Sequence, residues 1–166
     1  MLRFPVLSEG AEYLVMGHLM RRNILTYKAP PMNEGYDLIC IHPDPRRDGI
    51  GLNASPSLRI QVKSRYATDC DRAFPIKEEK LDCFDFLVVV FLNVGNFLTG
   101  AKDGKSGSRE PEFYTLSSDF IKEHHDNKSV WQKVRLSGVL EEIEQFKNEL
   151  GFELIAEQLG IPPLSR

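Results

Sequence analysis

The chain has 166 residues, of which 42% are hydrophobic and 27% are charged, and its formal net charge is −3 at pH 7. This length and composition are typical of one soluble globular domain with a substantial core. The balance of charge excludes a general polycation but leaves room for a local basic patch. The apolar run over residues 86–92 is too short to span a bilayer.

The three cysteines, Cys40, Cys70 and Cys83, are an odd number and have no metal-binding spacing. Such usage favours a reducing compartment over a disulfide framework. The N-terminus lacks the charged-then-apolar pattern of a signal peptide. We therefore expect a cytoplasmic protein with no membrane partner.

The first predicted element is a helix over residues 9–22, with Ser8 as its N-cap. Apolar positions recur at helical spacing and predict a buried stripe of Ala11, Leu14, Val15, His18 and Leu19. Glu12 lies beside that stripe. Asn23 is predicted to end the helix, and residues 24–28 are predicted to be extended.

Two strands are predicted next, over residues 35–41 and 58–64. In the second strand apolar and polar residues alternate, so Gln61 and Lys63 point to the same side. The connection is rich in turn-forming residues and favours a hairpin with a long polar loop. A paired register could bring Asp37 beside Gln61 and Lys63.

The remaining pattern alternates between helices and strands. A short helix is predicted over residues 76–82, and a strand buried on both faces, central in its sheet, over residues 85–92. A strand over 112–116 precedes a helix capped by Ser117 or Ser118, and residues 131–136 are predicted to form an edge strand. A helix over 140–150 is expected to break at Gly151 and to resume over 152–159. The fold class is therefore α/β, a mixed sheet flanked by helices.

Glu12 in the first helix, Asp37 within Gly-Tyr-Asp-Leu, and Gln61-Val62-Lys63 in the second strand together resemble the PD-(D/E)XK nuclease superfamily. The resemblance covers about residues 8–94 and implies a restriction-endonuclease-like core in the order α-β-β-β-α-β. It implies a single nuclease-like domain over residues 1–166, to which the C-terminal part adds strands and helices. The implied activity is endonuclease hydrolysis of phosphodiester bonds with Mg²⁺ or Mn²⁺, acting on nucleic acid, with DNA favoured over RNA.

The resemblance also implies a role for each residue. Asp37 would be the main carboxylate ligand of a hard cation, and Glu12 would supply a second one directly or through water. Gln61 could contact the metal, while Lys63 would reach the attacking water or the developing charge on the phosphate. Gln61 departs from the family pattern, because many members carry Asp or Glu there. The site thereby loses one negative charge, and its metal affinity should fall.

Three interpretations of these four residues stay open. Taken alone, Asp37 is typical of a turn or strand end, and Lys63 is typical of a solvated strand face. The set can also belong to a catalytically inactive module with the same fold that binds nucleic acid or a protein partner, which Gln61 and the modest net charge favour. In the third interpretation the protein serves protein interactions and the resemblance is accidental.

Cleavage of both strands of a duplex requires two active sites or a turn-around, so a homodimer is expected. Trp131, Phe146 and Phe152 could form its interface or could simply belong to the core. His124 and His125 are adjacent, point apart on a helix and make a poor metal pair. The loop cations Arg46 and Arg47 are solvated or contact phosphates.

Overall fold

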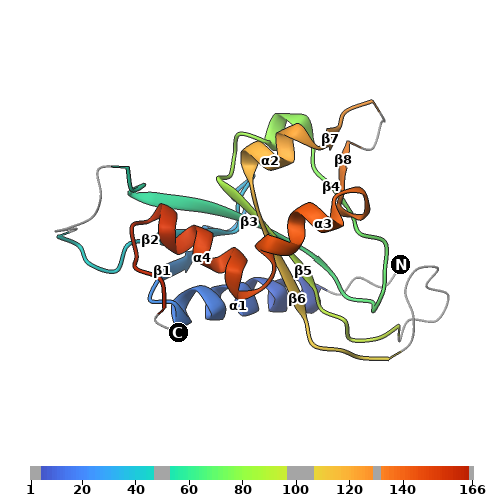
Figure 1. Cartoon of the computed structure of the whole chain (residues 1–166), viewed down its shortest axis with the longest axis horizontal. Helices are drawn as coiled ribbons and strands as arrows, with labels where there is room; N and C mark the ends of the chain where they lie inside the picture. The colour runs from blue at the N-terminus through green and yellow to red at the C-terminus, as the bar shows by residue number, and fades with distance from the viewer. Residues whose placement is uncertain (1–4, 47–52, 97–106, 129–131, 165–166) are drawn as a thin grey trace.

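The computed structural model describes residues 5–46, 53–96, 107–128 and 132–164. It is an α/β structure with a mixed main sheet of five strands and a small sheet of three strands (Figure 1). The main sheet has the order β1-β2-β3-β5-β6, with β1 at Leu25–Lys28, β2 at Leu38–Ile41, β3 at Ser57–Arg65, β5 at Phe86–Phe91 and β6 at Glu112–Ser117. The small sheet has the order β4-β8-β7, with β4 at Ala73–Pro75, β7 at His125–Asp126 and β8 at Lys133–Arg135.

The strands next to the candidate residues pair as the sequence predicts, but the strand predicted over residues 35–41 begins only at Leu38, so Asp37 lies just before it. β2 and β3 are antiparallel, with Leu38 opposite Ile60, and β3 pairs with β5 in parallel. All six residues of β5 are buried, and the strand lies between β3 and β6. The hairpin and the strand buried on both faces are thus confirmed.

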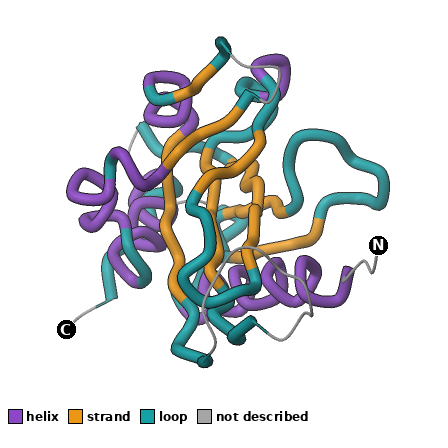
Figure 2. The backbone as a smooth tube through the Cα atoms, turned by 90° about the vertical axis from the view of Figure 1, so that its right-hand side faces the viewer, coloured by secondary structure: helices purple, strands orange, loops and turns teal. Residues whose placement is uncertain are grey.

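Helices and the small sheet cover the two faces of the main sheet. On one face α1 (Pro5–Arg21) and α4 (Glu149–Gln158) pack against β2, β3 and β5; Figure 2 shows α1, next to the N-terminus, running across the strands. The other face is covered by α2 (Ser118–Glu123), α3 (Leu140–Ile143) and the small sheet. Single turns of 3-10 helix link these elements, namely η1 (Glu78–Lys80), η2 (Leu136–Gly138) and η3 (Glu144–Phe146).

The first helix differs from its prediction at one end and along one face. It begins at Pro5, so Ser8 lies within the first turn and is not the N-cap; a proline suits that turn because its missing N–H is not needed there. Leu14 is 42% exposed, so the prediction that it is buried is wrong, and the stripe narrows to Ala11, Val15 and Leu19. Asn23, at φ 63°, does end the helix.

The C-terminal elements also differ in detail. Gly151 lies inside α4, and the break predicted there occurs at Asn148, whose φ is 51°. Asn148 accepts a hydrogen bond from the N–H of Phe113 through Oδ1, and this contact holds the turn against β6. A Cβ on Gly151 would lie 2.2 Å from the carbonyl oxygen of Phe146, so the glycine permits close packing rather than a break.

Three further predictions can be checked against these elements. The helix predicted over residues 76–82 is reduced to the single turn η1, and β8 lies between β4 and β7, so it is not an edge strand. Ser117 caps α2 by accepting the N–H of Phe120 at 3.2 Å, as expected. Phe152 is fully buried in the core, whereas Trp131 lies outside the described residues. No helix of the described part of the chain is long and apolar enough to cross a membrane.

Candidate functional site

Asp37 lies immediately before β2, where backbone bonds hold it on both sides. Its N–H donates to the carbonyl of Ile60 at 2.8 Å, and its carbonyl accepts the N–H of Ala29 at 2.7 Å. Its carboxylate oxygen Oδ2 accepts two hydrogen bonds, from the backbone N–H of Val62 at 2.7 Å and from Nε2 of Gln61 at 2.5 Å. The pairing of β2 with β3 therefore brings Asp37 and Gln61 into contact.

The charged form of the Asp37 carboxylate is destabilised by its surroundings. Burial raises its pKa above the usual value, and this effect exceeds the opposing influence of the Val62 N–H and of the charges of Lys63 and Lys28. The charges of Lys63 and Lys28 therefore do not fully offset the desolvation of the Asp37 carboxylate. A bound cation would stabilise the charged form of this group.

Gln61 and Lys63 share a face of β3, as their alternation predicts. Both line a cleft of about 420 Å³, together with the apolar side chains of Ile76 and Phe84. Lys63 makes no ion pair with any described residue, and its charge lowers the pKa of Asp37. The cleft therefore combines an amide, a nearby carboxylate and an ammonium group that is not engaged by an acid.

Glu12 projects from α1, the helix that packs on the face of the sheet that carries Ile60 and Val62. Its carboxylate pairs with Nζ of Lys28 at 3.0 Å, and Lys28 also pairs with Glu9 at 3.0 Å. Burial raises the pKa of Glu12, the hydrogen bond from Lys28 opposes the rise, and the charge of Asp37 adds to it. The structure thus places Glu12 near Asp37 electrostatically, but no hydrogen bond joins it to Asp37, Gln61 or Lys63 within the described residues.

Lys28 is the residue at this site that the sequence did not reveal. It ends β1, and its ammonium lies 4.6 Å from the centre of the Tyr13 ring. Glu9 and Glu12 raise its pKa, so it stays charged over the physiological range. The available signal was a lysine at the end of a predicted extended segment, and only the tertiary contact between α1 and β1 shows its partners.

The donor set at this site suits a hard cation. Among the described residues no group of three or more His, Cys, Asp or Glu side chains is placed to hold a metal ion, so waters would complete any coordination. Mg²⁺ accepts such an arrangement, because it binds one or two carboxylates and keeps several waters. Rotating the amide of Gln61 would exchange Nε2 for Oε1 and offer an oxygen ligand beside Asp37. The residues present therefore fit Mg²⁺ or Mn²⁺.

A second carboxylate on the same sheet shows what a purely structural role looks like. Asp85 accepts the backbone N–H of Arg59 at 2.6 Å and also binds its guanidinium through Nε at 3.2 Å and Nη2 at 3.0 Å. Both of its oxygens are thus engaged by one cation. Asp37 has no such dedicated partner among the described residues, and this difference separates a strand-locking ion pair from a site that can accept a cation.

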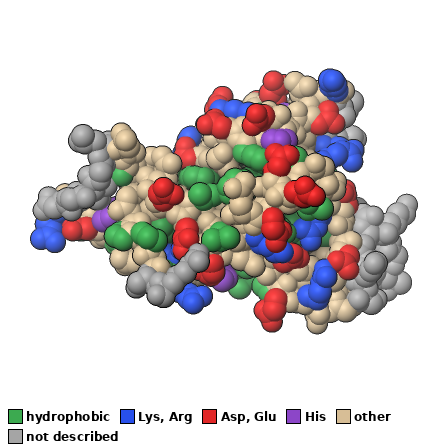
Figure 3. Space-filling model, in the orientation of Figure 1, with side chains coloured by type: hydrophobic (Ala, Val, Ile, Leu, Met, Phe, Trp, Pro, Cys, Tyr) green, Lys and Arg blue, Asp and Glu red, His purple; other side chains and the backbone are tan. Residues whose placement is uncertain are grey.

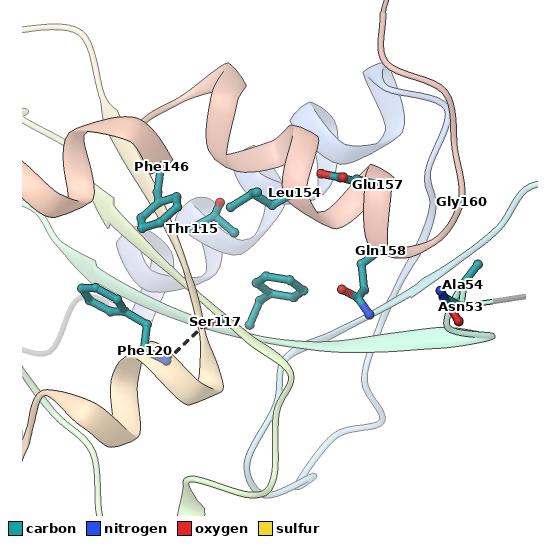
Figure 4. A pocket seen from close by; sticks show the side chains of 11 residues that line it. Asn53, Ala54, Thr115, Ser117, Phe120, Phe146, Leu154, Glu157, Gln158 and Gly160 are labelled. Atoms are coloured by element: carbon teal, nitrogen blue, oxygen red, sulfur yellow. Dashed lines mark hydrogen bonds between the residues drawn. The ribbon is translucent and has the colours of Figure 1, made fainter. Parts of the chain in front are cut away.

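A separate cavity of about 680 Å³ lies between α4, β6 and α2 (Figure 4). Phe120 and Phe146 line one end of it and Gln158 the other. None of the four predicted site residues lines this cavity. It is therefore distinct from the candidate site.

Neither a scan against protein-family models nor a search of curated proteins finds a match for this chain. Among solved structures the chain is similar to a bacterial homing endonuclease, I-Ssp6803I. The two are 17% identical, the alignment covers 82% of this chain and 76% of that chain, and the TM-score is 0.45.

Proposed function

We propose that this protein is a metal-dependent nuclease with a restriction-endonuclease-like fold that hydrolyses phosphodiester bonds of nucleic acid. The observation that carries the proposal is the contact between Asp37, just before β2, and Gln61, in the middle of β3, next to Lys63 in an open cleft. Carboxylate, amide and ammonium groups in this arrangement can bind a cation and a phosphate together. In a structural ion pair the carboxylate and the ammonium would instead neutralise each other and would not be available to a ligand.

Asp37 and Gln61 would hold the Mg²⁺ or Mn²⁺ ion, and Glu12 would support it from the α1 side through water. When bound, the ion would polarise the phosphate and lower the pKa of a nearby water. Asp37 is suited to this role because its charge is incompletely neutralised. Lys28 would hold the carboxylate of Glu12 in place through their 3.0 Å contact.

Lys63 would act on the phosphate side of the site. Successive residues on one face of a strand are about 6–7 Å apart, so Lys63 can reach a phosphate whose metal is held at Gln61. Its ammonium would stabilise the negative charge that develops as the water attacks. The absence of an acidic partner for Lys63 among the described residues leaves it able to do so.

The substrate proposed is DNA, bound through local sites rather than through a broad basic surface. Acidic and basic side chains are interspersed on the face seen in Figure 3, in keeping with the net charge of −3. Phosphate contacts of this kind position nucleic acid without reading its sequence. Cleavage of both strands would require two active sites or a turn-around, and we propose a homodimer as the working form.

The alternative function is a non-catalytic module that binds nucleic acid. Gln61 favours it, because an amide supplies no charge where a second carboxylate would strengthen metal binding, and Nε2 rather than Oε1 faces Asp37 in this structure. In that case Asp37 and Gln61 would form a polar pair that shapes the cleft.

The deciding experiment is cleavage of labelled single- and double-stranded DNA and RNA with Mg²⁺ or Mn²⁺. Asp37→Ala and Lys63→Ala should each lower the rate by about 10²–10⁴-fold, which is typical for the loss of one catalytic group. Asp119→Ala and Lys128→Ala, two exposed positions away from the site, are the matched controls. Binding without cleavage under either metal would select the non-catalytic module, and cleavage that survives both site substitutions would exclude this site.

A further inference from the structure

The cleft beside Gln61 and Lys63 has two walls that belong to different segments of the chain. One wall is the turn before β2 with Glu34 and Gly35, and the other is η1 with Lys77 and Lys80. Gly35, at φ 103°, packs so closely that an added Cβ would lie 2.3 Å from Cβ of Cys83. The walls therefore touch at their base, and the cleft between them is a built feature.

The wall formed by η1 is also attached to β3. Arg59 donates from Nη1 to the carbonyl of Asp82 at 3.1 Å while its other guanidinium nitrogens bind Asp85. These bonds join the chain just after η1 to the strand that carries Gln61 and Lys63. Lys77 and Lys80 thus keep a defined position relative to the candidate site.

On the η1 side of the cleft Lys77 pairs with Glu79 at 3.7 Å, and Glu34 spans the cleft with a second ion pair. Its carboxylate binds Nζ of Lys80 across the space between the two walls. The side chain of Glu34 is 79% exposed, whereas that of Lys80 is 33% exposed. The acid is therefore a solvent-facing arm, and the lysine is the part that the cleft wall holds. An exposed pair of this kind contributes little to stability, so a competing anion can displace the acid.

We propose that this cleft is a binding site for a backbone phosphate of DNA, next to the phosphate that reacts, and that Glu34 occupies it in the free protein. Lys80 is the main cation of this phosphate site; Lys77 lines the same wall, where its ammonium pairs with Glu79. The carboxylate of Glu34 stands in for phosphate oxygens. The inference rests on the proposed function, because it assumes that Gln61 and Lys63 face the reacting phosphate.

The arrangement predicts that Glu34 and Lys80 act on affinity in opposite directions. Lys80→Gln should weaken binding of a labelled DNA duplex and lower the slope of log K against log salt by about 0.9, which is the contribution of one phosphate contact. Glu34→Gln should tighten binding by about two- to fivefold, the equivalent of one exposed ion pair. In the Lys80→Gln background the effect of Glu34→Gln should disappear, because its partner is gone.

The test is fluorescence anisotropy of the labelled duplex with the full chain, measured in EDTA over a range of salt so that metal-dependent cleavage does not occur. The matched control is Asp82→Asn, which removes the partner of Lys122 from another exposed ion pair, 2.7 Å long and outside the cleft. Asp82→Asn should leave both the affinity and the salt slope unchanged.

The outcomes separate this inference from the proposed activity. Opposite and coupled effects of the two substitutions support the phosphate site even if no metal produces cleavage. A protein that cleaves DNA but binds it equally well with and without Lys80 would overturn the phosphate site and leave the nuclease intact. Failure of the unmodified chain to bind the duplex would overturn the site as well.

Discussion

Replacing Asp37 by asparagine should make the protein more stable while removing its proposed function. In the folded protein one oxygen, Oδ2, accepts both the Val62 N–H and the Gln61 side chain. The Oδ1 of an asparagine in the same place can accept both of these bonds. What disappears is the desolvated negative charge, because burial is the largest influence on the pKa of Asp37.

The expected gain is modest. Removing a charge that burial destabilises should help the folded state, and partial exposure of the carboxyl group limits the effect through solvent screening. We therefore expect Asp37→Asn to raise the free energy of unfolding at neutral pH within the range of about 0.5–2 kcal/mol that single stabilising substitutions commonly give.

The gain should depend on pH with a definite sign. The pKa of Asp37 is raised in the folded state, so the native protein binds the proton more tightly than the unfolded chain does. The contribution of Asp37 to wild-type stability should fall as the pH rises from the ordinary carboxyl pKa of 3.8 through the raised value. The difference between Asp37→Asn and wild type should be full above that window and absent below it.

Urea unfolding followed over pH measures both effects, and Asp85→Asn is the matched control. An amide at that position would turn an NH₂ group toward the guanidinium of Arg59, and the loss should be about 1–3 kcal/mol. The two substitutions have the same chemistry on the same sheet but opposite expected signs. If Asp37→Asn destabilised the protein as much as Asp85→Asn does, the inference that the charged form of Asp37 is destabilised in the folded protein would be wrong.

Three further predictions concern the surroundings of Asp37. Gly35→Ala should cost about 2 kcal/mol or more in urea unfolding, because of its positive φ and the clash with Cys83, whereas Gly17→Ala, which meets no atom within 4 Å, should gain up to about 1 kcal/mol. Gln61→Glu should lower stability without metal and bind Mg²⁺ at least about tenfold more tightly by calorimetry, since it adds a charge beside Asp37; unchanged affinity would place the metal elsewhere. Lys28→Met should raise the pKa of Glu12 in a carbon-13 NMR titration, because the hydrogen bond from Lys28 lowers it; an unmoved titration would contradict that contact.

The central strands were predictable because their sequence pattern is strongly one-sided. Leu58, Ile60 and Val62 alternate with polar residues and all three are buried, while β5 is apolar throughout and buried throughout. A pattern of period two leaves one register that keeps the apolar set inside. That register also put Gln61 beside Asp37, so this part of the site followed from the strand pairing alone.

The helices were harder to predict because their ends depend on tertiary contacts. Gly151 breaks helices by propensity, yet it lies inside α4 since the helix must pass close to Phe146 and Thr115. Leu14 fits the apolar period but faces solvent, because the sheet beneath α1 covers only a narrow stripe. Neither outcome can be read from local sequence, because both depend on what packs against the helix.

The position of Glu12 shows the same limit at the site itself. The order of residues along the chain placed it with Asp37, Gln61 and Lys63; the charge of Asp37 does act on its pKa, but among the described residues no hydrogen bond joins it to the other two. The carboxylate of Glu12 pairs with Lys28, a residue that no sequence pattern singled out. The face on which a helix packs is a tertiary property, so sequence order alone could not show which partner the Glu12 carboxylate takes.

Strand β3 presents two different charge environments over residues 59–63. Arg59 forms an ion pair with Asp85, the residue before β5, and this pair holds the two strands together. Two and four residues further along, Gln61 and Lys63 line an open cleft beside Asp37. Burial destabilises the charged form of the Asp37 carboxylate. Stability alone would favour an ion pair at Asp37 like the one between Arg59 and Asp85, because a buried carboxylate without a cationic partner is costly. The retained imbalance at Asp37 is what a site that binds a cation and a phosphate requires.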